Sequence, residues 1–197
     1  MIERIKFAEY EWFLWLNSFH SPLWDTIMFW VTYRFTWIPL YVYIIYYIFK
    51  KLKQYAWQNL AFVLLSAGLA DRLTSGVMKP YFQRLRPCHD PIIQHLVHVV
   101  GDCGGQFGFV SSHAANSFAL LMSFFLLTKK AGVSIKNLLT FLCFWAIIVS
   151  YSRIYVGVHF PTDVLVGGLV GVLIPSILFP FFIFINLKLQ KLNPSNS

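Results

Sequence analysis

Residues 160–187 read FPTDVLVGGLVGVLIPSILFPFFIFINL, and Asp163 is the one charged side chain in this stretch. A bilayer core of about 30 Å is crossed by roughly 20 helical residues, so a stretch this long and apolar predicts a transmembrane helix. Further apolar stretches of this kind lie at 22–49, 58–78, 112–128 and 138–155. The sequence therefore predicts an all-α membrane protein, a bundle of about five transmembrane helices.

The composition supports this fold class and excludes others. Of the 197 residues, 57% are hydrophobic and only 12% are charged, which excludes a disordered chain, a nucleic-acid-binding tail and an ordinary soluble domain. Charges interrupt residues 1–19 too often for a span, so this segment predicts an amphipathic interfacial helix. We expect 1–197 to be one integral-membrane domain with a lipid bilayer as its partner, no nucleic acid, and a polar tail at 193–197.

Basic residues predict the orientation of the helices. Short Lys-rich connectors follow the first and third predicted spans, and two more lysines lie near the C-terminus: Lys50, Lys51, Lys53, Lys129, Lys130, Lys136, Lys188 and Lys191. The positive-inside rule places these segments in the cytoplasm. The long loop 79–110 and the turn at 157–159 are then expected on the outside.

Three outward-facing segments carry most of the unexpected polar residues. The first, KPYFQRLRP at 79–87, is either a belt of snorkelling basic side chains or a clamp for a phosphate group, because Arg and Lys donate to phosphate oxygens. In the second, VSSH at 110–113, a serine can cap the next helix, whereas His113 can transfer a proton. In the third, SRIYVGVHFPTD at 152–163, a His and an Asp lie four residues apart at a helix start. There the carboxylate can orient the imidazole, although such a pair can also be purely structural.

Together these segments resemble the motifs of the type 2 phosphatidic acid phosphatase superfamily. The first and third motifs are complete, with Lys79, Arg86 and Pro87 in one and Ser152, Arg153, His159 and Asp163 in the other. The second motif keeps Ser111 and His113, but Val110 replaces its Pro and Ser112 replaces its Gly. The departure concerns the geometry of that loop more than its chemistry, because Ser112 still offers a backbone amide.

The resemblance implies a role for each matching residue. His159 attacks phosphorus and forms a phosphohistidine, Asp163 supports it, and His113 protonates the leaving oxygen. The nonbridging phosphate oxygens are held by Lys79, Arg86, Ser111, Arg153 and the amide of Ser112. These cationic side chains supply the positive charge, so the resemblance implies neither a metal nor another cofactor.

The expected substrate is a membrane lipid, because an active site at the outer helix ends suits an amphiphile whose head group rests at the interface. Within the family, a small chain with an outward site most resembles an undecaprenyl-diphosphate phosphatase or a lipid A phosphatase of the bacterial inner membrane, with its site facing the periplasm. We expect the first, and phosphatidylglycerophosphate is another candidate lipid. A lipid phosphotransferase on the same scaffold stays open, as does the oligomeric state. The apolar spans disfavour a vanadate-dependent haloperoxidase. The presence of both His113 and His159 disfavours a non-catalytic scaffold.

The remaining polar residues suggest structural roles. Cys88 and Cys103 both fall in the outward loop, where disulfides persist, so we expect them to pair. With His89, His95 and His98 they fit no standard zinc spacing. Charged residues inside predicted spans are expected to pair with one another; these are Arg34, Asp71 and Arg72.

Overall fold

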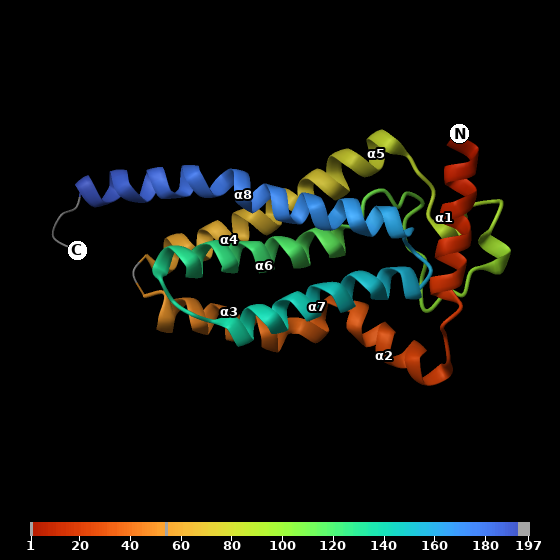
Figure 1. Cartoon of the computed structure of the whole chain (residues 1–197), viewed down its shortest axis with the longest axis horizontal. Coiled ribbons are helices and arrows are strands. Elements are labelled where there is room, and N and C mark those ends of the chain that lie inside the picture. Colours follow the sequence, from red (N-terminus) through yellow and green to blue (C-terminus); the bar gives the residue numbers. More distant parts are fainter. Residues whose placement is uncertain (1, 54, 193–197) are drawn as a thin grey trace.

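The computed structural model describes residues 2–53 and 55–192, and most of them are helical (Figure 1). In chain order the elements are α1 (Ile2–Asn17), α2 (Pro22–Thr32), the 3₁₀ segment η1 (Arg34–Trp37), α3 (Ile38–Lys51), α4 (Ala56–Asp71), the π-helical segment η2 (Arg72–Met78), α5 (Lys79–Phe82), the 3₁₀ turns η3 (Pro87–His89) and η4 (Gln94–Leu96), α6 (Ser112–Ala131), α7 (Lys136–Tyr155) and α8 (Pro161–Leu192). None of the described residues belongs to a β-strand beyond an isolated bridge between Leu85 and Phe107. The polar tail expected at 193–197 lies outside the described residues.

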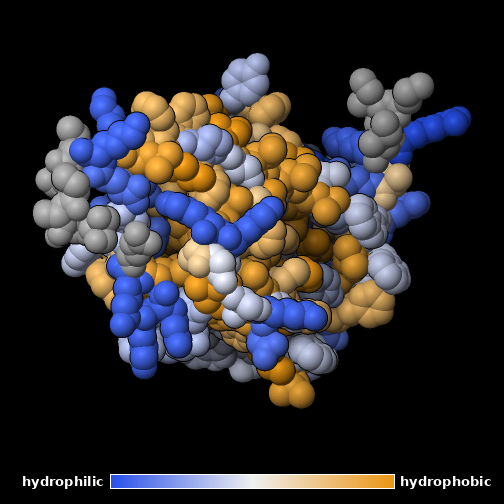
Figure 2. Space-filling model, turned by 60° about the vertical axis from the view of Figure 1, so that its left-hand side comes forward, coloured by the Kyte–Doolittle hydropathy of each residue, from blue (hydrophilic) through white to orange (hydrophobic). Residues whose placement is uncertain are grey.

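Within the described ranges, three helices are long and apolar enough to cross a membrane, namely the 27 residues Ala56–Phe82, the 20 residues Lys136–Tyr155 and the 31 residues Pro161–Lys191. They agree with the predicted spans at 58–78, 138–155 and 160–187 apart from a few residues at their ends. The face of the molecule seen in Figure 2 is mainly hydrophobic and is crossed by a few hydrophilic side chains. The structure thus confirms an all-α membrane protein. The span predicted at 112–128 forms α6, which is not one of these three helices.

The first predicted span, 22–49, is not one helix. α2 ends at Thr32, Tyr33 is extended with ψ of 117°, and α3 begins at Ile38 after the 3₁₀ segment η1. Pro39 lies in the first turn of α3, where its missing N–H and the clash of its ring with the carbonyl of residue 35 favour the start of a helix over a continuous α-helix. The prediction of a continuous helix there was wrong.

The loop predicted at 79–110 begins later than expected. The helix formed by α4, η2 and α5 continues to Phe82, and Gln83, with φ of 47°, turns the chain into the loop. Pro80 would clash with the carbonyl of Gly76 in a regular α-helix, and the wider π-helical turn of η2 lies directly before it. A proline therefore lies inside the continuous helix.

α6 lies in the middle of the bundle, where it packs against α4, α7 and α8 (Figure 1). Its contact with α8 is very close: a Cβ atom added at Gly167 would lie 2.4 Å from the carbonyl oxygen of Ser111, and one at Gly171 would lie 2.3 Å from that of Ala115. Small residues one turn apart allow two membrane helices to approach in this way. This contact brings the first turns of α6 and α8 together.

α1 lies across the end of the bundle at which α6 and α8 begin (Figure 1). Its buried face includes Tyr10 and Phe13, whose rings lie 5.7 Å and 5.4 Å from that of Phe160. An amphipathic helix with this orientation agrees with the interfacial position predicted for 1–19. That position in a membrane remains a prediction.

Candidate active site

The three motifs predicted to act together meet at one cavity of about 520 Å³. The cavity extends from the outer end of the bundle down between α3, α4, α6 and α7. At its outer end the wall is formed by Lys79, Arg86, Ser112, His113, Arg153 and His159. Segments far apart in the sequence therefore place six of the eight predicted catalytic and phosphate-binding residues around one space.

His159 lies in the turn between α7 and α8 and is 1% exposed. Its Nδ1 atom is 3.4 Å from Oδ2 of Asp163, so Nε2 lies on the far edge of the ring. Burial, followed by the charges of Arg153, Arg86 and Lys79, holds the pKa of His159 well below its ordinary value. The imidazole is therefore neutral, with a lone pair available for attack.

Asp163 lies behind His159, away from the cavity wall, and is fully buried. Its Oδ2 atom accepts a hydrogen bond of 3.0 Å from the backbone N–H of Phe160. Its Oδ1 atom accepts one of 3.0 Å from Nη1 of Arg84. These donors fix the carboxylate so that it can orient the imidazole.

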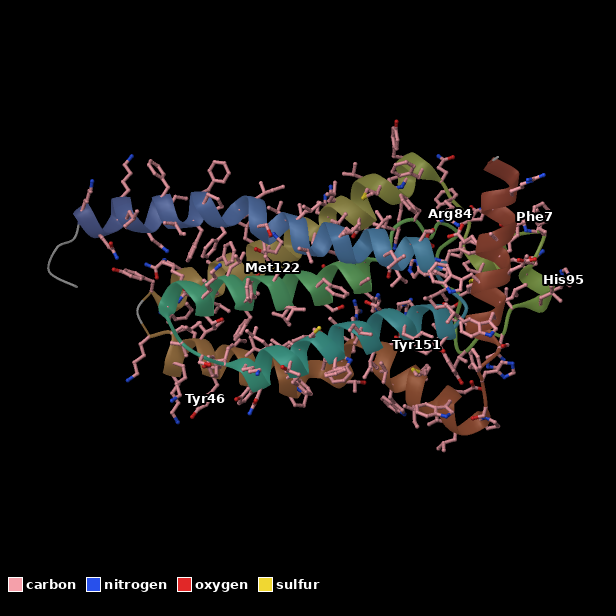
Figure 3. The ribbon with its side chains drawn as sticks, in the orientation of Figure 1. Phe7, Tyr46, Arg84, His95, Met122 and Tyr151 are labelled. Carbon is pink, nitrogen blue, oxygen red and sulfur yellow. A yellow bond between two sulfur atoms is a disulfide. The ribbon has the colours of Figure 1, made fainter. Side chains whose placement is uncertain are left out.

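Arg84 connects this carboxylate to α1. The same Nη1 atom lies 2.8 Å from the hydroxyl of Thr162, and the Nη2 atom forms an ion pair with Glu9. Glu9 also accepts a hydrogen bond from Thr162. Figure 3 shows Arg84 between α1 and the start of α8. No local pattern predicts the role of Glu9, because 75 residues separate it from Arg84.

Three cations surround the outer part of the cavity without a carboxylate partner among the described residues. Lys79 lies at the start of α5, and Arg86 donates to the carbonyl oxygens of Cys103 at 2.6 Å and Phe107 at 3.3 Å. Arg153 donates to Thr32, while its Nε atom is buried without a partner. Cationic donors arranged around an open space are suited to bind an anion with several oxygens, such as phosphate.

A disulfide helps to form the loop that positions Arg86. The structure joins Cys88 and Cys103 across 15 residues, with their Cα atoms 6.4 Å apart. Arg86 contacts the carbonyl of Cys103, so the bond lies directly behind one of the cationic side chains. The ligand atoms of Cys88, His89 and Cys103 lie within 4.8 Å of one another, but both sulfur atoms are used by the disulfide.

The start of α6 differs from the sequence prediction at one residue. The hydroxyl of Ser111 accepts a hydrogen bond from the N–H of Ala114 at 3.4 Å and thereby caps the helix. Ser111 is fully buried and absent from the cavity wall, so the structure does not bring its side chain to the expected phosphate position. Ser112 does line the cavity, and its hydroxyl contacts those of Thr74 at 2.9 Å and Ser75 at 2.7 Å.

The expected pairing of charges inside the spans is also absent. No ion pair joins Arg34, Asp71 and Arg72 in the ranges that the structure describes. Asp71 instead accepts a hydrogen bond of 3.2 Å from Nδ2 of Asn116, and the guanidinium of Arg34 lies 4.9 Å from the ring centre of Phe35. Both Arg34 and Asp71 line the cavity.

Known proteins resemble this chain over most of its length. A lipid A 4'-phosphatase of Bacteroides thetaiotaomicron is 36% identical over 177 residues, covering 87% of this chain and 75% of the relative. A second protein of that name, from Porphyromonas gingivalis, is 33% identical over 187 residues, covering 93% of this chain and 76% of the relative.

The crystal structure of a transmembrane PAP2-type phosphatidylglycerolphosphate phosphatase from Bacillus subtilis has the same fold. It superimposes with a TM-score of 0.69 at 24% identity, over 90% of this chain and 86% of that one. The profile of the PAP2 superfamily matches residues 56–185, a range that includes all three motifs. The chain therefore belongs to the PAP2 superfamily, the type 2 phosphatidic acid phosphatase superfamily that its motifs resemble.

Proposed function

We propose that this protein is a membrane lipid phosphatase that uses His159 as a covalent nucleophile. The observation that carries the proposal is the buried His159, backed by Asp163 and facing a cavity with three cations that have no carboxylate partner among the described residues. Such cations offset the repulsion between a phosphate dianion and an incoming nucleophile. Covalent catalysis then divides hydrolysis into two easier steps.

In the first step, Nε2 of His159 forms a bond to phosphorus while the bond from phosphorus to the lipid oxygen breaks. His113 gives its proton to that oxygen, so the lipid leaves as a neutral alcohol. In the second step a water molecule attacks the phosphohistidine, His113 takes up the water proton, and inorganic phosphate is released.

The favoured substrate is a lipid A type of phosphorylated glycolipid. Both relatives described above are named lipid A 4'-phosphatases, and they match this chain over most of its length. This evidence favours lipid A over undecaprenyl diphosphate, the substrate expected from the sequence. The cavity supports a lipid in general, because below its cationic end it is lined by apolar side chains such as Ile44, Leu60 and Trp145.

The proposed location follows from the orientation of the helices. Lys-rich connectors lie at the end of the bundle opposite the catalytic motifs, so the positive-inside rule places the site on the periplasmic face of a bacterial inner membrane. A lipid head group exposed on that face can enter the cavity directly.

A phosphate-release screen tests the proposal. Purified protein in detergent is incubated with lipid A, undecaprenyl diphosphate, phosphatidylglycerophosphate and phosphatidate, with and without EDTA. We expect release from lipid A, no loss of rate with EDTA, and no turnover by His159→Ala. Asp163→Asn should be slower while still binding phosphate, since only the support for the nucleophile is changed. Near-normal activity of His159→Ala contradicts the mechanism, and labelled phosphate found on a second lipid instead of in solution identifies a transferase.

A further inference from the structure

We infer that Asp71 and Asn116 form a second binding subsite in the cavity, which accepts hydrogen bonds from the leaving alcohol of the substrate. Hydroxyl or amide N–H groups next to the phosphate, as in an acylated amino sugar, fit this subsite. The inference rests on the proposed function and adds a determinant of substrate class to it.

The position of the subsite follows from the helices that carry it. Asn116 is one turn beyond His113 on α6, about 4.5 Å deeper along the helix axis. Asp71 precedes Lys79 by eight residues, which is about 12 Å along the same continuous helix. Both residues line the cavity below its cationic end. His113 protonates the leaving oxygen of the substrate. The substrate atoms bonded to that oxygen therefore lie next to Asn116 and Asp71, and the rest of the lipid extends into the apolar part of the cavity.

Asp71 and Asn116 together act as a hydrogen-bond acceptor. Nδ2 of Asn116 donates to Oδ1 of Asp71 at 3.2 Å, and this contact fixes the amide because its oxygen would repel the carboxylate. The Oδ1 atom of Asn116 is consequently left without a partner. No described residue donates to Oδ2 of Asp71, so the pair has one acceptor atom on the cavity wall and a second, buried one without a partner among the described residues.

A purely structural role does not explain this pair. A carboxylate among membrane-spanning helices is costly unless a cation or a hydrogen-bond donor compensates it. Of the two arginines expected to neutralise Asp71, Arg34 packs against Phe35 and Arg72 packs along its own helix beside Gly76. Asn116 compensates one oxygen of Asp71, and the charge of Lys79 acts on the carboxylate from the cationic end of the cavity. A donor on the ligand would supply the hydrogen bond that Oδ2 still lacks.

The subsite distinguishes classes of phosphorylated lipid. A sugar-linked phosphate brings hydroxyl and amide donors to the two acceptors. A lipid diphosphate would bring a second negative charge toward Asp71, and phosphatidate has no donor beside its phosphate. A site built to bind donors strongly disfavours analogues that lack them, because its polar atoms then stay unpaired.

The test compares kcat/KM for lipid A with kcat/KM for phosphatidate, both in mixed micelles. The variants are Asp71→Asn and Asn116→Leu, with Glu11→Gln on the exposed face of α1 as the matched control. Arg34→Gln tests whether Arg34, a cation that lines the same cavity, affects the ratio of the two kcat/KM values. We expect each subsite variant to lower the ratio of the two kcat/KM values by about tenfold or more, the effect of losing one hydrogen bond to a charged or buried acceptor. The control should leave the ratio unchanged.

The ratio separates recognition from folding, since a damaged fold reduces both activities equally. Equal losses on both lipids, or an unchanged ratio in both subsite variants, would overturn the inference. So would a ratio that depends on Arg34 alone, or a wild-type protein that hydrolyses phosphatidate as fast as lipid A. A wild-type protein that releases phosphate from neither lipid overturns the proposed function itself, and the inference with it.

Discussion

At the scale of single residues, the protonation of His159 connects the fold to the proposed chemistry. Its side chain lies in a buried turn between two membrane helices, near the cationic side chains of the cavity. Each of these conditions disfavours a positively charged imidazole. A nucleophile that stays neutral in this environment does not have to lose a proton before it attacks.

We therefore expect His159 to remain neutral as the pH falls from 7.5 to about 5.5, through the ordinary histidine pKa of about 6.5. The unfolded chain takes up this proton below about pH 6.5 while the folded chain does not, so the free energy of unfolding should decrease as the pH falls. Ring ¹⁵N shifts of histidine-labelled protein, assigned with His159→Ala, measure the protonation. A midpoint near pH 6.5 for the His159 signal would contradict the prediction.

The sequence predicted the chemical groups of the site better than their connections. His159 and Asp163 lie four residues apart at the start of a helix, so their proximity followed from helical geometry. The hydroxyl of Ser111 could not be assigned in advance, because the same residue type caps helices and binds phosphate. Glu9 and Arg84 come together only through tertiary packing, which no local pattern encodes.

At the scale of elements, the contact between α6 and α8 determines how precisely the site is assembled. The backbone N–H of Ser111 on one side donates to the carbonyl of Asp163 on the other at 2.9 Å. The helices can approach this closely because glycines face α6 from α8. A change in their separation therefore moves the start of α6 relative to His159.

Gly171→Ala should destabilise the protein by about 1–3 kcal/mol, the usual cost of overpacking, because its new methyl group would lie 2.3 Å from a backbone oxygen. Gly68→Ala on α4 is the matched control, since nothing lies within 4 Å of the added atom there. Melting temperatures in detergent measure the difference. Equal melting temperatures for the two variants would show that the packing of α8 against α6 accommodates the methyl group without loss of stability.

α1 is the second element with a direct connection to the site, through Glu9 and Arg84. Glu9→Gln removes the charge that holds Arg84 against Asp163, and we expect kcat to fall about threefold to tenfold with little change in KM, corresponding to about 1 kcal/mol. The control is Glu11→Gln, because Glu11 is exposed on the same helix. Steady-state kinetics on lipid A measure both variants. Equal kcat values for Glu9→Gln and Glu11→Gln would show that α1 packs against the bundle without affecting catalysis.

At the scale of the whole molecule, the orientation in the membrane is the property that the sequence predicts and the structure alone does not fix. A Cys143→Ser background retains the disulfide and leaves no free native thiol. In intact cells, a membrane-impermeant thiol reagent should label Leu96→Cys, whose native side chain is 58% exposed, and should not label Lys130→Cys. The opposite labelling pattern would place the site in the cytoplasm.

The overall architecture was largely predictable because length and apolarity identify membrane helices without reference to their neighbours. The interruptions were less predictable, since a proline can lie in the first turn of a new helix, as at Pro39, or inside a continuous helix after a π-helical turn, as at Pro80. Charges inside the spans were misjudged for a related reason. Pairing is the usual way to stabilise them, but Asp71 lies on a cavity wall that the sequence does not reveal.

Ile45 of α3 and Leu64 of α4 line the cavity and are also 42% and 62% exposed, so we expect the cavity to open sideways between these helices. A lipid can therefore place its head group at His159 while its chains stay in the hydrocarbon phase. The acyl chains of the lipid then do not have to leave the membrane for water, a transfer that costs about 0.8 kcal/mol of free energy per methylene group. The encounter between enzyme and substrate becomes two-dimensional diffusion, so the rate should follow the mole fraction of substrate in the membrane or micelle. Adding inert detergent at a fixed total amount of lipid should slow turnover in proportion to this dilution.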